Sequence, residues 1–151
     1  MKASRIMTVN VTSITPETPL SRAHEIMKKL RVRHLPVVSQ QGVLVGILSD
    51  RDLLVRGTLL ADGALAFPAL PASIAMTDDP ITCRPGTPVS QLAELMLQHR
   101  IDSLPIVGGH KELVGLVTSS DLLALLREPE HISDVLPFQF QLRSADEVMA
   151  S

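Results

Sequence analysis

Two short polar sequences in the chain hold the side chains best suited to bind a small molecule. Residues 49–52 (SDRD) and 118–121 (TSSD) each place a hydroxyl three positions before a carboxylate, directly after an aliphatic run. A carboxylate can accept two hydrogen bonds from a sugar diol, and the free N–H groups at a helix start favour phosphate. The same spacing is also a helix capping box, in which the carboxylate bonds the backbone of the hydroxyl residue. Both interpretations stay open, and the two roles do not exclude each other.

These two sequences belong to an internal repeat. Shifted by 69 residues, positions 6–54 match positions 75–123 without a gap, with 18 identities in 49 positions. Ordinary residue frequencies would give about three by chance. The chain therefore contains two copies of one unit.

Each copy carries the signals of the same elements in the same order. A short extended segment, 11–15 or 81–84, leads to Thr-Pro, where Thr18 or Thr87 is expected to cap a helix. Two aliphatic runs separated by turn residues then predict a β-hairpin, and a second helix follows. We predict an α/β (α+β) fold of two β-α-β-β-α units, packed through their sheets about a pseudo-twofold axis.

The last helix of the repeat is apolar over residues 122–126, more than a single buried stripe needs. We therefore predict a homodimer, with this helix and the first helix of each copy as contacts. In the alternative, the tail 132–142 folds back over the helix. The alternating FQFQL run at 138–142 is expected to add a strand or to cap the dimer.

Basic side chains gather in the first copy, close to its polar sequence. Residues 1–73 carry a net charge of +4 and residues 74–151 a net charge of −6. The basic cluster contains Arg31, Arg33, His34 and Arg51. The counterparts of the last three in the second copy are Asp102, Ser103 and Ser120. The alternative to a binding role is a solvated basic face that pairs with acidic residues of the second copy.

Composition excludes several classes of function. The chain has no Trp, no Tyr, three Phe and a net charge of −2, which argues against nucleic-acid partners. Its apolar stretches are far shorter than the ~20 residues of a membrane span, so no membrane partner is expected. A start without a signal-peptide pattern and a single cysteine predict a cytoplasmic protein.

No catalytic or metal-binding motif is complete. The sequence HEIMK at 24–28 opens like the zinc-binding HExxH, but its last residue is Lys28. The glycine-rich loops that hold phosphates are missing, and Cys83 is expected to be a buried packing residue. We predict that the chain is not an enzyme, has no metal site and requires no cofactor.

The repeated motifs resemble a pair of CBS (cystathionine β-synthase) motifs, the tandem known as a Bateman module. The resemblance rests on Met-Thr, then Pro-x-Thr-Pro, then LPVV or LPIV, then LVGILSDRDLL or LVGLVTSSDLL, and covers residues 6–126. It is closest to the small stand-alone type, which includes acetoin-utilisation proteins. The expected division is motif 1 at 6–57, a linker at 58–73, motif 2 at 74–127 and a C-terminal tail at 128–151.

The resemblance implies adenosine-containing ligands, AMP, ADP, ATP or S-adenosylmethionine, in the clefts between the two motifs. For the phosphate and ribose groups of the ligand it implies contacts with Ser49, Arg51, Asp52, Arg33, His34, Thr118, Ser120 and Asp121. For the base it implies contacts at Thr12, Ile14, Ile81 and Cys83, with Pro36 and Pro105 nearby. Which base-contacting segment serves which carboxylate stays open. Because the basic cluster lies in motif 1, phosphate is expected mainly in the pocket of Asp52.

We therefore expect a regulatory module that senses an adenine nucleotide or S-adenosylmethionine and signals to its dimer mate or to an unidentified protein partner. The alternative is a dimerisation or protein-interaction module whose ligand pockets are vestigial.

Overall fold

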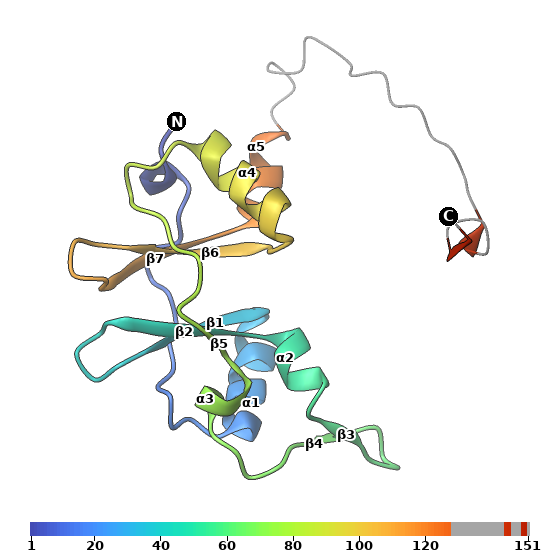
Figure 1. The fold of residues 1–151 in the computed structure, drawn as a ribbon. Coiled ribbons are helices and arrows are strands. Elements are labelled where there is room, and N and C mark those ends of the chain that lie inside the picture. The colour runs from blue at the N-terminus through green and yellow to red at the C-terminus, as the bar shows by residue number, and fades with distance from the viewer. Residues whose placement is uncertain (128–143, 146–148, 151) are drawn as a thin grey trace.

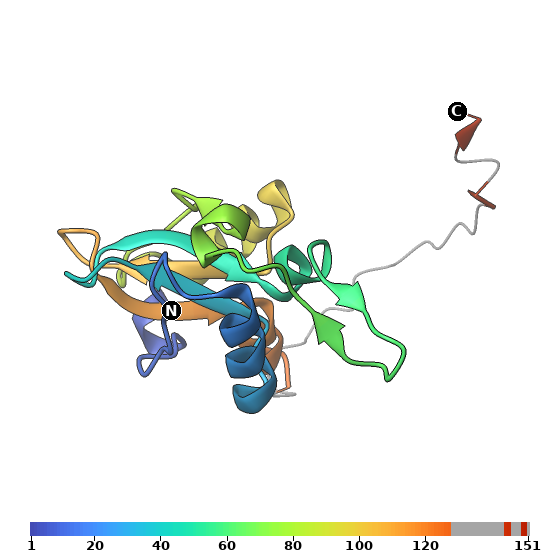
Figure 2. The same cartoon turned by 90° about the horizontal axis from the view of Figure 1, so that it is seen from below.

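Two antiparallel sheets lie face to face in the structure, each with helices on its outer side (Figure 1). The computed structural model describes residues 1–127, 144–145 and 149–150. The view from below looks along the stacking direction, so the two sheets overlie each other, and a hairpin of the linker extends to one side (Figure 2). The α/β class and the packing of two units through their sheets are thus confirmed. The expectations for the tail at 132–142 lie outside the described residues.

The elements of the two copies correspond one to one. The first copy contains α1 (Leu20–Leu30), β1 (His34–Val38), β2 (Leu44–Ser49) and α2 (Asp50–Leu54). The second copy contains α4 (Val89–His99), β6 (Ser103–Val107), β7 (Leu113–Thr118) and α5 (Ser119–Leu125). A short turn, η1 (Ala3–Arg5), precedes them, and between them lie β3 (Thr58–Leu59), β4 (Leu65–Ala66), α3 (Ala72–Ala75) and β5 (Thr77–Asp78).

The segment that opens each copy crosses to the sheet of the other copy. Thr8 pairs antiparallel with Leu116 of β7, and β5 pairs antiparallel with β2. Each copy then returns to its own sheet, where Ile14 and Cys83 form parallel bridges with β1 and β6. The two halves are therefore tied together by exchanged segments, and neither sheet is complete without the other copy.

Glycines in β2 and β7 let the crossing segments approach closely. A Cβ atom on Gly46 would lie 2.5 Å from Sδ of Met76, and one on Gly115 would lie 2.6 Å from Sδ of Met7. The repeated Met-Thr and Leu-Val-Gly patterns thus contact each other twice, because the methionine of each copy packs against the glycine of the other copy.

Helices α1 and α4 begin without the predicted threonine caps. Their N-cap residues are Pro19 and Pro88, both in extended conformation. The hydroxyls of Thr18 and Thr87 instead accept hydrogen bonds, each 3.1 Å long, from the backbone N–H three residues earlier. The capping prediction is wrong because these hydroxyls close the turn before the helix.

The two β-hairpins join at their turns across the pseudo-twofold axis. The N–H of Leu44 donates to the carbonyl of Lys111 over 3.0 Å, and the N–H of Leu113 donates to the carbonyl of Gly42 over 3.2 Å. Gly42 has a φ of +78°, a conformation that glycine adopts without strain. These backbone bonds fix one end of the inter-copy cleft, and the candidate site lies at the other end.

Candidate functional site

Both strand-to-helix junctions form the capping arrangement that the sequence allowed. At the start of α2, the N–H of Ser49 donates to Oδ2 of Asp52 over 2.8 Å, and the N–H of Asp52 donates back to Oγ of Ser49 over 3.1 Å. At the start of α5, the N–H and hydroxyl of Thr118 donate to Oδ2 of Asp121 over 2.7 and 3.2 Å. The carboxylates therefore stabilise the first turns of these helices.

Capping uses only one of the two oxygen atoms of each carboxylate. Among the described residues, the hydrogen bonds to the Asp52 and Asp121 side chains all end on Oδ2. Oδ1 of each residue can therefore still accept hydrogen bonds from a ligand. The cap also fixes the orientation of the carboxylate, so it prepares the second oxygen for that role.

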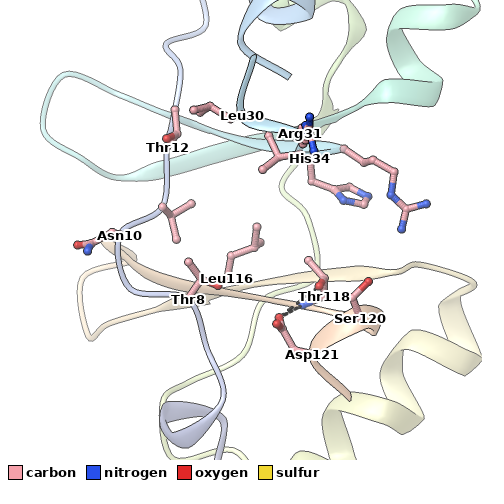
Figure 3. A pocket seen from close by; sticks show the side chains of 13 residues that line it. Thr8, Asn10, Thr12, Leu30, Arg31, His34, Leu116, Thr118, Ser120 and Asp121 are labelled. Carbon is pink, nitrogen blue, oxygen red and sulfur yellow. Dashed lines mark hydrogen bonds between the residues drawn. The ribbon is translucent and has the colours of Figure 1, made fainter. Parts of the chain in front are cut away.

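A pocket of about 470 Å³ lies between the two halves beside the second of these junctions. Figure 3 shows Thr12, Leu30 and His34 on one side of it and Thr118, Ser120 and Asp121 on the other. The lining residues are Thr8, Asn10, Val11, Thr12, Leu30, Arg31, Val32, Arg33, His34, Leu116, Thr118, Ser120 and Asp121. Both copies contribute, so a ligand here would contact both halves.

The positive side of the pocket comes from the residues just before β1. Arg31 ends α1 in the left-handed conformation, with a φ of 55°, which turns the chain toward the cleft. Arg33 is exposed, whereas the His34 side chain is 10% exposed. Nε2 of His34 lies 2.9 Å from Oδ1 of Asp102, and Nη2 of Arg33 lies 4.0 Å from Oδ2 of the same residue. The pairing with acidic groups of the second copy, left open by the sequence, is thus present.

The structure groups the predicted phosphate contacts differently from the sequence prediction. Arg33 and His34 line the pocket of Asp121, whereas Arg51 and Asp52 are not among its lining residues. The reason is the face-to-face packing, which sets the start of β1 opposite the strand-to-helix junction of the other copy. The basic cluster of motif 1 is thereby divided: Arg33 and His34 line the pocket of Asp121, and Arg51 does not.

The predicted base contacts are also divided. Thr12 lines the pocket, but Ile14 and Cys83 are 5% and 7% exposed and belong to the two hydrophobic cores. Pro36 and Pro105 are buried, and Ile81 is half-buried beside the second core. These five residues are not among the lining residues. Ile14 and Cys83 point inward because their backbones pair with β1 and β6.

Several lining residues were not among those predicted from the sequence. They are Thr8, Asn10, Val11, Leu30, Arg31, Val32 and Leu116. The repeated Met-Thr pair marked Thr8 as part of the unit, but its place beside β7 follows from the exchange of segments.

The described residues offer little for nucleophilic or metal chemistry. Burial raises the pKa of the Cys83 thiol, and a hydrogen bond with the Thr87 side chain only partly opposes this shift. The thiol is therefore a poor nucleophile near neutral pH. In the part of the chain that the structure describes, no group of three His, Cys, Asp or Glu side chains could hold a metal ion, and no helix is long and apolar enough to cross a membrane.

Comparison with known families decides the classification. The CBS domain model matches residues 3–56 and 72–128. The chain belongs to the CBS domain family. It carries the domain twice, and all the residues that line the pocket lie within the two matched ranges.

The CBS pair is similar to known proteins over most of its length. It is 37% identical over 117 residues to the CBS domain-containing protein YhcV of Bacillus subtilis (strain 168), covering 77% of this chain and 79% of YhcV. It also matches a homoserine O-acetyltransferase of Methanohalobium evestigatum and an inosine-5'-monophosphate dehydrogenase of Nitrosopumilus maritimus. It spans only 24% and 23% of those two enzymes, so their activities do not carry over to it.

Solved CBS pairs share its fold. A putative acetoin utilization protein (AcuB) from Vibrio cholerae has a TM-score of 0.70 and 31% identity, covering 83% of this chain and 89% of that one, which confirms the resemblance to acetoin-utilisation proteins. The CBS domain pair of MJ0100, in complex with 5'-methylthioadenosine and S-adenosyl-L-methionine, has a TM-score of 0.71 and 27% identity, with coverages of 83% and 94%. CBSX2 from Arabidopsis thaliana, in complex with AMP, has a TM-score of 0.71 and 25% identity, with coverages of 82% and 94%.

Proposed function

We propose that this CBS pair is a regulatory module that binds an adenosine-containing ligand in the pocket of Asp121. Two of its structural relatives were solved with such ligands, 5'-methylthioadenosine and S-adenosyl-L-methionine in one and AMP in the other. The volume of the pocket, about 470 Å³, lies in the range of small-molecule sites. A cytoplasmic location, expected from the sequence, is part of this proposal.

The observation that carries the proposal is the pairing of an open carboxylate oxygen with cationic side chains across one pocket. Oδ1 of Asp121 is suited to accept hydrogen bonds from the two hydroxyls of a ribose. Arg31 and Arg33, on the opposite wall, are suited to a phosphate or to another electron-rich group of the ligand. We therefore propose Asp121 for the main site, whereas the sequence suggested mainly Asp52.

The base has no aromatic partner in the pocket, so it would lie against aliphatic side chains. Val11, Leu30, Val32 and Leu116 supply such surface. Polar atoms of the base would then bond to backbone groups or to Thr8, Asn10 and Thr12, which line the same pocket.

Regulation would follow from the position of the pocket between the halves. A ligand that contacts both copies favours one inter-copy geometry over others, provided that its affinities for those geometries differ. The proposed output is a change transmitted to a dimer mate or to a partner protein.

Thermal unfolding tests whether any such ligand binds. A ligand that binds only the folded protein, at about 100 times its Kd, adds about 2.7 kcal/mol of stability, which raises Tm by roughly 5–10 °C in a chain of this size. We expect at least one of adenosine, AMP, ADP, ATP and S-adenosylmethionine to do so, while inorganic phosphate alone does not. If none of the five raises Tm at millimolar concentration, the proposal fails.

A second candidate is an assembly module, favoured by apolar side chains on the outer helices. Leu97 of α4 is 80% exposed, and Leu123 of α5 and the adjacent Leu126 are 63% and 61% exposed. We propose that these helices contribute to a homodimer interface. This role is compatible with ligand binding, and it stands alone if no ligand is found.

A further inference from the structure

Asp102 brings a negative charge to the edge of the pocket, although it is not one of the lining residues. Its two carboxylate oxygens lie 2.9 Å from Nε2 of His34 and 4.0 Å from Nη2 of Arg33. Both partners line the pocket, and both belong to the other copy. The Asp102 side chain is 52% exposed, so burial does not fix it in place.

The contact with His34 sets the carboxylate against a residue of the pocket wall. Nε2 of His34 and Oδ1 of Asp102 lie 2.9 Å apart, and the His34 side chain is only 10% exposed. The negative charge of Asp102 therefore lies beside a residue that lines the pocket.

Arg33 is attracted by Asp102 but not locked to it. Their separation of 4.0 Å is longer than a hydrogen bond, and the Arg33 side chain is 60% exposed. A phosphate in the pocket and the Asp102 carboxylate would therefore compete for the same guanidinium.

The charges around the pocket nearly balance. Its lining has two permanent positive charges, Arg31 and Arg33, and one negative charge, Asp121. Asp102, beside Arg33, offsets the surplus. We propose that Asp102 is a specificity-determining residue, which makes the pocket favour adenosine compounds with little negative charge over nucleoside polyphosphates. This inference rests on the proposed function and adds the ligand class to it.

The variant Asp102→Asn removes the charge at small cost to the fold. Exposed ion pairs contribute about 0–1 kcal/mol of stability, and Asn keeps nearly the size and shape of Asp. Asp62→Asn is a charge-matched control. Asp62 lies between β3 and β4 in the hairpin of the linker and accepts a hydrogen bond from the N–H of Ala64, which an Asn can also do.

Calorimetric titration of adenosine, AMP and ATP into the three proteins tests the inference. For Asp102→Asn we expect an unchanged affinity for adenosine and an affinity for AMP that rises about 3- to 10-fold, with a larger gain for ATP. The gain should shrink near 1 M salt, where the screening length falls to about 3 Å. Asp62→Asn should behave like the unaltered protein.

Two results would overturn the inference in distinguishable ways. If Asp102→Asn changes the affinities for all three ligands equally, or changes none of them, Asp102 does not select ligands by charge. The proposed function is unaffected by that result, because the ligands still bind. If none of the three ligands binds to any of the proteins, the inference fails, whereas the proposed function fails only if ADP and S-adenosylmethionine do not bind either.

Discussion

At the scale of single residues, two glycines pack tightly against a methionine of the other copy. Gly115 meets Met7, and Gly46 meets Met76, at distances that leave no room for a Cβ atom. The carbonyl oxygens of Thr8 and Thr77 lie only 3.1 and 3.0 Å from the same Cβ positions, so the backbone would have to shift as well.

Substitution of either glycine should therefore destabilise the protein. We expect Gly115→Ala and Gly46→Ala each to lower the free energy of unfolding by about 1–3 kcal/mol, the usual cost of overpacking. Urea denaturation measures it, with Gly109→Ala as the control, because a Cβ there would have no neighbour within 4 Å. Unchanged stability in both core variants would contradict the proposed role of the exchanged segments.

Residue types were easier to predict than their partners. The capping of α2 by Asp52 and of α5 by Asp121 follows from spacing along the chain, and the structure contains both. The grouping of Arg33 and His34 with Asp121 depends on which surfaces face each other across the axis. Local sequence does not contain that information, so the sequence grouped Arg33 and His34 with Asp52, whereas they line the pocket of Asp121.

At the scale of elements, the repeat predicted the helices and hairpins, because periodicity and turn residues act locally. It did not predict the exchange of Thr8 and β5 between sheets, since pairings of only one or two residues leave almost no signal in a sequence. The β3–β4 hairpin, in the expected linker at 58–73, was missed for the same reason.

The outer helices lead to a prediction about assembly. We expect the protein to sediment as a dimer and Leu123→Glu to sediment as a monomer, because a charge on this face opposes burial. Leu59→Glu is the control, since Leu59 is 71% exposed but lies on the linker hairpin. A monomeric parent protein, or a Leu123→Glu variant that stays dimeric, would show that this face is not the interface.

At the scale of the whole molecule, the charge difference between the copies becomes a contact between them. Positions 33 and 102 are equivalent in the repeat, and the structure brings them together as Arg33 and Asp102. Identical residues there would repel each other, whereas the diverged pair attracts. Divergence has thus given equivalent positions of the two halves opposite charges beside one pocket.

The central claim is that this pocket binds its ligand through Asp121. Asp121→Ala and Asp52→Ala each remove the capping hydrogen bond from the backbone N–H three residues earlier, and Asp121→Ala also removes one from the Thr118 hydroxyl, but only Asp121 lines the pocket. The direct test is calorimetric titration of both variants with the ligand that gives the largest rise in Tm. We predict that Asp121→Ala weakens binding about 10- to 100-fold, the loss expected for hydrogen bonds to a charged group, while Asp52→Ala stays within about twofold of the unaltered protein. Equal losses in the two variants, or a larger loss in Asp52→Ala, would contradict the account.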